Sequence, residues 1–251
     1  MRASLPPRPR AFRILATAGI LVLQTACAGL EGSDHGAYDR APGFNRASFE
    51  LSEALDNKLL EPVARGYLDL VPRPVEAGVV NFFANLRTVD SSINGFLQGK
   101  PKRGGADMMR LLLNSTVGVA GLFDVATPAG FAAQNEDFGQ TLAVWGWRNS
   151  RYVYVPLVGP STLRDLPSMA IRAFAPRLLV GGGYPIWASG IDVLATRADA
   201  LALTDARDAA ALDRYAFTRE AYYQRRQFQI FDGDPPLDDF DDFFDETDGP
   251  P

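Results

Sequence analysis

The chain has 251 residues, 47% hydrophobic and 22% charged, enough for one large domain or two small ones with a real core. Its 25 basic and 30 acidic residues include four arginines in 1–26 and nine acids in 232–251, so the body between them carries 21 of each sign. A neutral body argues against nucleic acid as a partner and against simple electrostatic adhesion to anionic lipid. Any contact with a membrane must therefore be made by attached acyl chains and apolar side chains.

The first 26 residues have the pattern of an export signal. Their four arginines precede or flank an apolar run of ten residues, Ile14 to Leu23. Ten residues are too few to span a bilayer as a helix, but they suit the hydrophobic part of a secretory signal peptide. A short N-terminal anchor helix is the alternative interpretation.

Cys27 follows this run and is the only cysteine, so an internal disulfide is excluded. The preceding LQTA resembles a bacterial lipobox, although Gln24 stands where leucine is usual. In lipoproteins with such a site the signal is removed before the cysteine, and the thiol is diacylated. Cys27 is therefore the predicted lipid anchor, and Ala28 after it favours sorting to the outer membrane. A buried or reactive free thiol is the alternative.

Composition divides the rest of the chain into three parts. Residues 27–42 are small, polar and rich in glycine after the cysteine, which predicts a lipidated flexible tether. Residues 43–231 form the predicted helical domain. Residues 232–251 hold nine acids and no Lys or Arg, which predicts an acidic disordered tail, either a solvated end or a docking peptide.

Apolar residues recur at helical spacing along the body. Only 152–158 has strand character, and Pro156 argues against a central strand. Ser161 or Thr162 is the expected N-cap of the fifth helix. The expected helices cover residues 44–60, 74–86, 104–117, 136–145, 161–174, 186–203 and about 209–231.

The sequence offers no catalytic constellation. The single histidine, His35, lies in the tether, and no nucleophile elbow, dinucleotide fingerprint or phosphate loop is present. The aspartates of the tail are adjacent rather than spaced as metal ligands. We therefore expect no catalytic, cofactor-binding or metal-binding residues, although paired carboxylates can do acid–base work without histidine. The chain is expected to bind or conduct.

The helix over 104–117 is apolar around most of its circumference. Asp107, Arg110 and Asn114 fall within an arc of roughly 60°, a narrower polar face than a surface helix usually has. Asp107 and Arg110, three residues apart, are spaced to form an ion pair. We call these three residues the polar seam.

Seven segments in order resemble the MlaA (VacJ) family of outer-membrane lipoproteins. The first contains Phe44, Asn45 and Arg46, which we treat as the family motif. The segments are GFNRASFE (43–50), DLVPRPVEAGVVNFFANL (69–86), INGFLQGK (93–100), LLNSTVGVAGLFDVA (112–126), EDFGQTLAVWG (136–146), VPLVGPSTLRD (155–165) and REAYYQRR (219–226).

The resemblance implies an all-α fold: a single ring-like helical domain lying in the inner leaflet of the outer membrane, with a central polar channel. Members of the family act with trimeric porins. They pass phospholipids that have strayed to the outer leaflet to a soluble periplasmic carrier (MlaC-like), and an inner-membrane transporter completes retrieval. No cofactor and no covalent chemistry is implied.

The resemblance also suggests site residues. The polar seam fits a channel-lining position, since polar surface in such a protein belongs along the channel. A buried helix with a satisfied ion pair in an ordinary core is the alternative. A hairpin-like loop is expected to border the channel, with RNSR at 148–151 departing from the glycines usual in the family. The loop residues singled out are Val155, Pro156, Gly159, Pro160, Ser161 and Arg164.

Three functions compete at this point. The leading one is a passive lipid conduit that maintains outer-membrane lipid asymmetry. The second is a structural lipoprotein that decorates porins without moving lipid. The third, disfavoured by the lack of a suitably placed histidine, is a phospholipase.

Overall fold

The computed structural model describes residues 39–180 and 185–236. The chain divides into two compact units, 1–37 and 38–251, and all described elements belong to the second. The predicted signal peptide, the anchor Cys27 and most of the tether and tail lie outside the described residues. These assignments, and the domain boundaries that depend on them, stay predictions.

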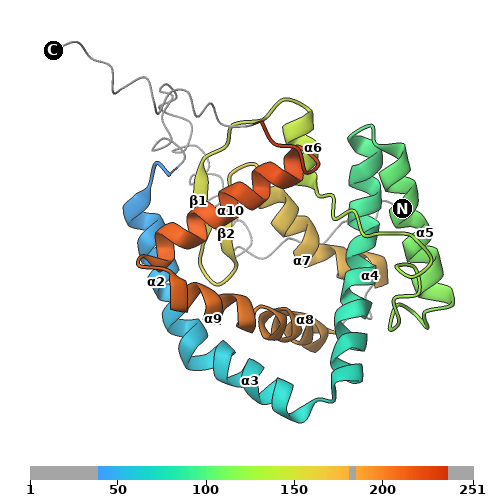
Figure 1. Ribbon diagram of the computed structural model, residues 1–251, viewed down its shortest axis with the longest axis horizontal. Helices are drawn as coiled ribbons and strands as arrows, with labels where there is room; N and C mark the ends of the chain where they lie inside the picture. Colours follow the sequence, from blue (N-terminus) through green and yellow to red (C-terminus); the bar gives the residue numbers. More distant parts are fainter. Residues whose placement is uncertain (1–38, 181–184, 237–251) are drawn as a thin grey trace, which may run out of the picture. The chain divides into compact units, whose positions relative to one another are not determined.

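The described residues are mostly helical, as expected, with one small antiparallel hairpin (Figure 1). The order of elements is α2 (Pro42–Leu55), the π-helical turn η3 (Asp56–Leu60), α3 (Glu61–Leu70), α4 (Arg73–Leu97), α5 (Pro101–Thr116), α6 (Phe138–Val144), β1 (Tyr152–Val155), β2 (Gly159–Thr162), α7 (Leu166–Val180), α8 (Ile186–Asp199), α9 (Leu201–Ala210) and α10 (Arg214–Ile230).

Helical backbone continues past residue 60, where the first expected helix ends. The π-helical turn η3 joins α2 to α3, and Pro62 lies in the first turn of α3. A proline is tolerated there because the first N–H groups of a helix have no partner within it.

The expected helix over 161–174 was wrong at its start. Ser161 and Thr162 belong to β2, where Ser161 pairs with Val153, and α7 begins only at Leu166. The reason is the turn that precedes them: Leu157 and Gly159 both adopt positive φ, which reverses the chain and starts a return strand.

The C-terminal helices are shorter than expected. The segment 186–203 breaks between α8 and α9 at Ala200, and the last helix begins at Arg214 rather than near 209. Asp213 caps α10, because its carboxylate accepts a hydrogen bond from the backbone N–H of Ala216 at 3.1 Å.

Helices α4 and α5 form the most extensive helix pair of the described fold, side by side in Figure 1. Their backbones approach closely at two glycines. A Cβ atom on Gly95 would lie 2.8 Å from the backbone nitrogen of Gly104, and one on Gly104 would lie 2.9 Å from the ring of Phe96. A side chain at Gly95 would meet backbone and push the helices apart, whereas one at Gly104 would require the partly exposed ring of Phe96 to move.

Two small apolar clusters lie within the fold. Phe49 packs with Tyr152, Tyr154 and Tyr215 where α2 meets the hairpin and α10. The second cluster contains Ala64, Ala198 and Leu201, where α3 meets α8 and α9. Neither cluster lies at the α4–α5 contact, where buried side chains are mostly polar.

We expect Gly95→Ala to destabilise the protein by about 1–3 kcal/mol, because the new methyl group meets backbone that has to move. Gly105→Ala is the matched control in the same helix pair. Its Cβ meets no atom within 4 Å, so a gain of up to about 1 kcal/mol is expected from helix propensity. Denaturant unfolding of the detergent-solubilised protein measures both, and equal stability of the two variants would contradict the close approach.

Candidate functional site

The distribution of polarity in the described residues is reversed relative to a soluble protein. The buried residues comprise 22 polar or charged ones and only 12 hydrophobic ones, half of them alanine. Large apolar side chains are instead exposed on every α-helix, including Leu70 (85% exposed) and Trp187 (66%). Soluble proteins bury such residues and leave polar groups outside. The candidate site is therefore the polar interior.

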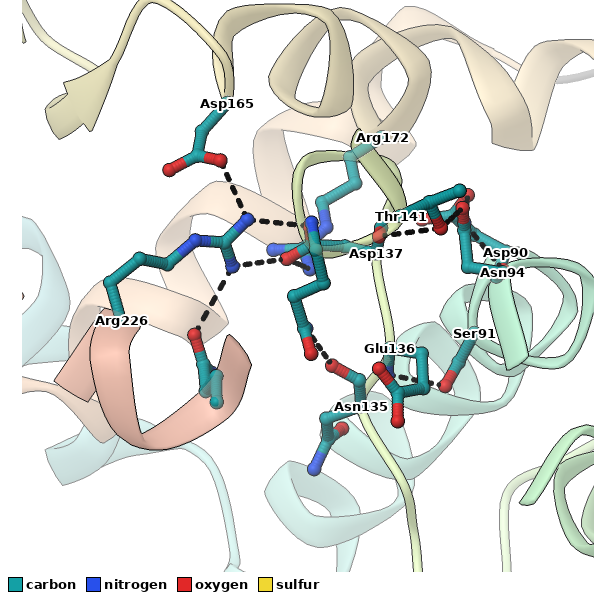
Figure 2. Close-up of polar contacts among 12 residues, drawn as sticks. Asp90, Ser91, Asn94, Asn135, Glu136, Asp137, Thr141, Asp165, Arg172 and Arg226 are labelled. Carbon is teal, nitrogen blue, oxygen red and sulfur yellow. Dashed lines mark hydrogen bonds and ion pairs between the residues drawn. The ribbon is translucent and has the colours of Figure 1, made fainter. Parts of the chain in front are cut away.

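Arg226 of α10 lies at the centre of this interior. Its guanidinium donates to both carboxylate oxygens of Asp137, at 2.6 and 2.7 Å, and to Asp165 at 2.7 Å. The side chains of all three residues are less than a tenth exposed. Figure 2 shows Arg226 between the two carboxylates, with Arg172 of α7 approaching Asp137, which it reaches at 3.2 Å. We call Arg226, Asp137 and Asp165 the ionic triad.

Local structure places each member of the triad. Asp137 is the N-cap of α6, where its carboxylate accepts from the backbone N–H of Gln140 at 3.0 Å. Asp165 lies between β2 and α7 and also accepts from Tyr222 at 2.7 Å and Thr162 at 2.8 Å. The triad thus fastens α10 to α6 and to the hairpin.

Gly139 makes room for the triad. A Cβ atom at this position would lie 2.1 Å from an oxygen of Asp165 and 2.4 Å from a guanidinium nitrogen of Arg226. The first turn of α6 therefore packs its bare backbone against the ion pair, and any other residue would displace it.

Electrostatics in the triad follow from burial and pairing. Burial by itself raises the pKa of the Asp137 carboxyl, but the hydrogen bonds and charge of Arg226 outweigh burial and leave that pKa well below its ordinary value. The same competition, with Arg164 assisting Arg226, lowers the pKa of Asp165. Both carboxylates are charged at neutral pH, so the interior is polar but compensated.

A second chain of polar contacts joins α4 to the segment before α6 (Figure 2). Ser91 donates to Asp107 and accepts from the backbone N–H of Glu136 at 2.8 Å. Thr141 of α6 donates to Asn94 of α4 at 2.7 Å. Ser91 and Asn94 of α4 therefore face α5 and α6 rather than solvent.

The polar seam is buried against the segment that follows α5. Arg110 forms its ion pair with Asp124 at 3.2 Å, so the direct pair with Asp107 expected from spacing is not made. Asn114 accepts from the backbone N–H groups of Val125 and Ala126 at 2.9 and 3.0 Å. This burial favours the satisfied interior that sequence left as the alternative, and a wet path along the seam requires the 124–134 segment to move.

The loop residues singled out in sequence separate into two groups. Pro156 lies at the exposed tip of the hairpin, and Val155, Gly159 and Pro160 are half-buried beside it. Ser161 and Arg164 are buried. Arg164 bonds to Asp165 at 3.0 Å and to the backbone carbonyls of Trp147 and Arg148, so it supports the triad rather than facing an opening.

The family motif joins α2 to the hairpin. Asn45 is completely buried; its amide oxygen accepts from the backbone N–H of Tyr154 at 2.9 Å, and its amide nitrogen donates to Asp39 at 2.7 Å. Arg46 pairs with Asp213 at 2.7 Å, and Phe44 is exposed. The motif is thus one residue that ties elements together flanked by two surface residues.

Within residues 39–180 and 185–236, no cluster of three His, Cys, Asp or Glu side chains is arranged to hold a metal ion. No helix in the same ranges is long and apolar enough to cross a bilayer.

Sequence reasoning missed the ionic triad. Three of the quoted segments contain its members, yet none of these residues was singled out: Asp137 lies in EDFGQTLAVWG, Asp165 in VPLVGPSTLRD and Arg226 in REAYYQRR. The available signal was a charged residue at the N-cap position of a short helix and a second arginine on the apolar side of the last helix.

Comparison with known proteins shows which family this chain resembles. The family model described as MlaA lipoprotein matches residues 37–229. The "Intermembrane phospholipid transport system lipoprotein MlaA" of Escherichia coli K12 is 33% identical over 226 residues, which cover 86% of this chain and 88% of the relative. The protein of the same name from Haemophilus influenzae is 30% identical, covering 78% and 80%.

A solved structure described as "Structural basis for maintenance of bacterial outer membrane lipid asymmetry" contains a similar chain. It has a TM-score of 0.64 and 35% sequence identity, and the match covers 76% of this chain and 98% of that one.

We expect Arg226→Met to destabilise the protein by about 3 kcal/mol or more at pH 7, because it leaves two buried carboxylates without their main partner. The neighbouring, exposed Arg225→Met should change stability by less than about 0.5 kcal/mol.

The loss of stability caused by Arg226→Met should depend on pH. Because the folded-state pKa values of Asp137 and Asp165 are lowered, their contribution is present above about pH 4 and is lost as pH falls through the folded values. The stability difference between wild type and Arg226→Met should therefore shrink from pH 7 to pH 3 in denaturant unfolding. A difference that stays constant over this range would argue against the triad.

Proposed function

Because the chain belongs to the MlaA lipoprotein family, we propose that it is an outer-membrane lipoprotein that removes mislocalised phospholipids from the outer leaflet and passes them through a channel to a periplasmic carrier. The family resemblance drawn from the seven sequence segments is confirmed. The E. coli relative is named for intermembrane phospholipid transport, and this activity is the one we carry over.

The observation that carries the proposal is the reversed polarity. Exposed apolar side chains cover the described helices, while charged residues lie inside in paired arrangements. Apolar surface removed from water stabilises the membrane-bound state by roughly 25 cal/mol per Å². A protein surrounded by lipid must satisfy its polar groups internally, because acyl chains offer no hydrogen-bond partner. Helices that lie within one leaflet meet both conditions.

A compensated polar interior also suits lipid passage. A headgroup needs polar walls to leave the membrane surface, but an unpaired buried charge would hold it too tightly to release it. In the ionic triad two carboxylates share the main cation, and Arg172, whose side chain is 48% exposed, adds a further one. We place the route beside this network and the hairpin, in a ring-like domain; the polar seam lines it only if the 124–134 segment moves.

The partners in this proposal come from the family. We expect a trimeric porin to hold the protein in the outer membrane and a soluble, MlaC-like carrier to receive lipid on the periplasmic side. Cys27 is the proposed lipid anchor. The passage needs no cofactor and no covalent step, because lipid moves down its own free-energy difference.

Deletion of the gene tests the proposal directly. A membrane-impermeant amine reagent added to intact cells should label several-fold more phosphatidylethanolamine in the deletion strain, and plasmid-borne wild type should reverse the increase. Transport predicts this change because uncollected phospholipid accumulates in the outer leaflet.

The competing functions give different results. Unchanged labelling, with the protein verified at normal level in the complemented strain, would support a structural porin-associated lipoprotein. Release of fatty acid by the purified protein would support a phospholipase. Either result contradicts the conduit.

A further inference from the structure

A cleft of about 390 Å³ lies where the first turn of α5, the segment before α6 and the end of α10 meet. Figure 1 shows the end of α10 beside α6. The cleft is distinct from the ionic triad, although it shares α10 with it. Its principal lining residues are Arg103, Gln134, Gln140, Arg225, Phe228 and Asp232.

Arg225 is the cation that the fold leaves available in this cleft. Its neighbour Arg226 is buried and bonded to two carboxylates, whereas Arg225 is exposed and has no hydrogen bond or ion pair to another described residue. The two adjacent arginines of REAYYQRR therefore have different roles. One holds the interior together, and the other faces the cleft.

Arg103 adds a second cation to the wall. Its contacts to Glu136 (2.9 Å) and Asp232 (2.6 Å) both use Nη1. Among the described residues, its Nε and Nη2 donors have no hydrogen-bond partner. A guanidinium with one free edge can bind two oxygens of a phosphate side by side.

Amides complete the wall. Gln140 is only 2% exposed yet lines the cleft, with its side-chain nitrogen bonded to the Asn135 carbonyl at 3.0 Å. The Gln229 amide oxygen accepts from Arg226 at 3.2 Å, which leaves the amide nitrogen of Gln229 as a donor at the same cleft. The wall is rich in donors and suits a ligand rich in acceptors.

The charge and shape of the cleft further restrict the class of ligand that it can bind. Lys100 and Arg103 both bind the carboxylates of Glu136 and Asp232, so these four charges balance. Arg225 is then the cation in excess. The balance favours a ligand group with a single negative charge. The ring of Phe228, 57% exposed, supplies an apolar surface beside these cations. A volume of this size holds a small polar headgroup with part of its glycerol.

We propose that this cleft binds the phosphodiester group of a phospholipid, with Arg225 as its main cation. The proposal rests on the proposed function and adds to it a headgroup site formed by α5, α6 and α10. The same donors would also accept inorganic phosphate, so the test separates the two sources.

Titration calorimetry of the purified protein in a nonionic detergent tests the site. The probes are dihexanoyl phosphatidylethanolamine, below its own micelle concentration, and inorganic phosphate. Arg225→Gln should weaken binding of the lipid about tenfold or more, because a charge-assisted contact is lost. Lys102→Gln, which removes an exposed charge next to Arg103 without lining the cleft, should change binding by less than about twofold.

Circular dichroism and unfolding of Arg225→Gln should match wild type, since Arg225 has no described partner to lose. Equal lipid affinity of Arg225→Gln and wild type would overturn the proposal. So would binding of inorganic phosphate as tightly as of the lipid, because the site would then recognise a small anion. Neither result bears on retrieval in cells, which the labelling of the deletion strain decides independently.

Discussion

The guanidinium of Arg226 is the contact on which the polar interior depends. Asp137 and Asp165 lie 89 and 61 residues away in sequence, at the start of α6 and before α7, and both bond to this one cation. Burying three charges is tolerated only when they are paired. Here both Nη atoms of Arg226 bond to carboxylates, whereas its buried Nε has no hydrogen-bond partner among the described residues. The bare backbone at Gly139, the capping of α6 and the support from Arg164 all serve that requirement.

The apolar exterior and the charged interior have one explanation. In water, exposed Leu70 and Trp187 would be unfavourable, whereas acyl chains would cover them. Acyl chains offer polar groups no hydrogen-bond partner, so such groups belong in paired arrangements inside the protein. The same arrangement suits transport, because a wall whose charges are compensated admits a headgroup without trapping it. The cleft differs from that wall because its Arg225 pairs with no carboxylate among the described residues, which is why we assign the cleft to binding rather than passage.

Local patterns in the sequence predicted much of the fold. Apolar spacing located α5 and the first half of α4, which continues to Leu97 beyond the expected end at 86, and the strand character of 152–158 located β1, the first strand of the hairpin. The pairing of Ser161 with Val153 depends on a chain reversal, which the spacing of apolar residues does not predict. The triad has no local signal, because its members meet only through tertiary structure. The polar seam was recognised as unusual, but its partner, Asp124, lies in an irregular segment whose course spacing cannot predict.

Tryptophan fluorescence tests the central claim, that the exposed apolar surface contacts acyl chains. All three tryptophans of the chain, Trp145, Trp147 and Trp187, are exposed in the fold, at 59%, 46% and 66%. With the protein reconstituted into vesicles of brominated phospholipid, we predict strong quenching by the acyl-chain bromine and weak quenching by iodide in the buffer. Strong quenching by iodide together with little effect of bromine would place this surface in water and contradict the account.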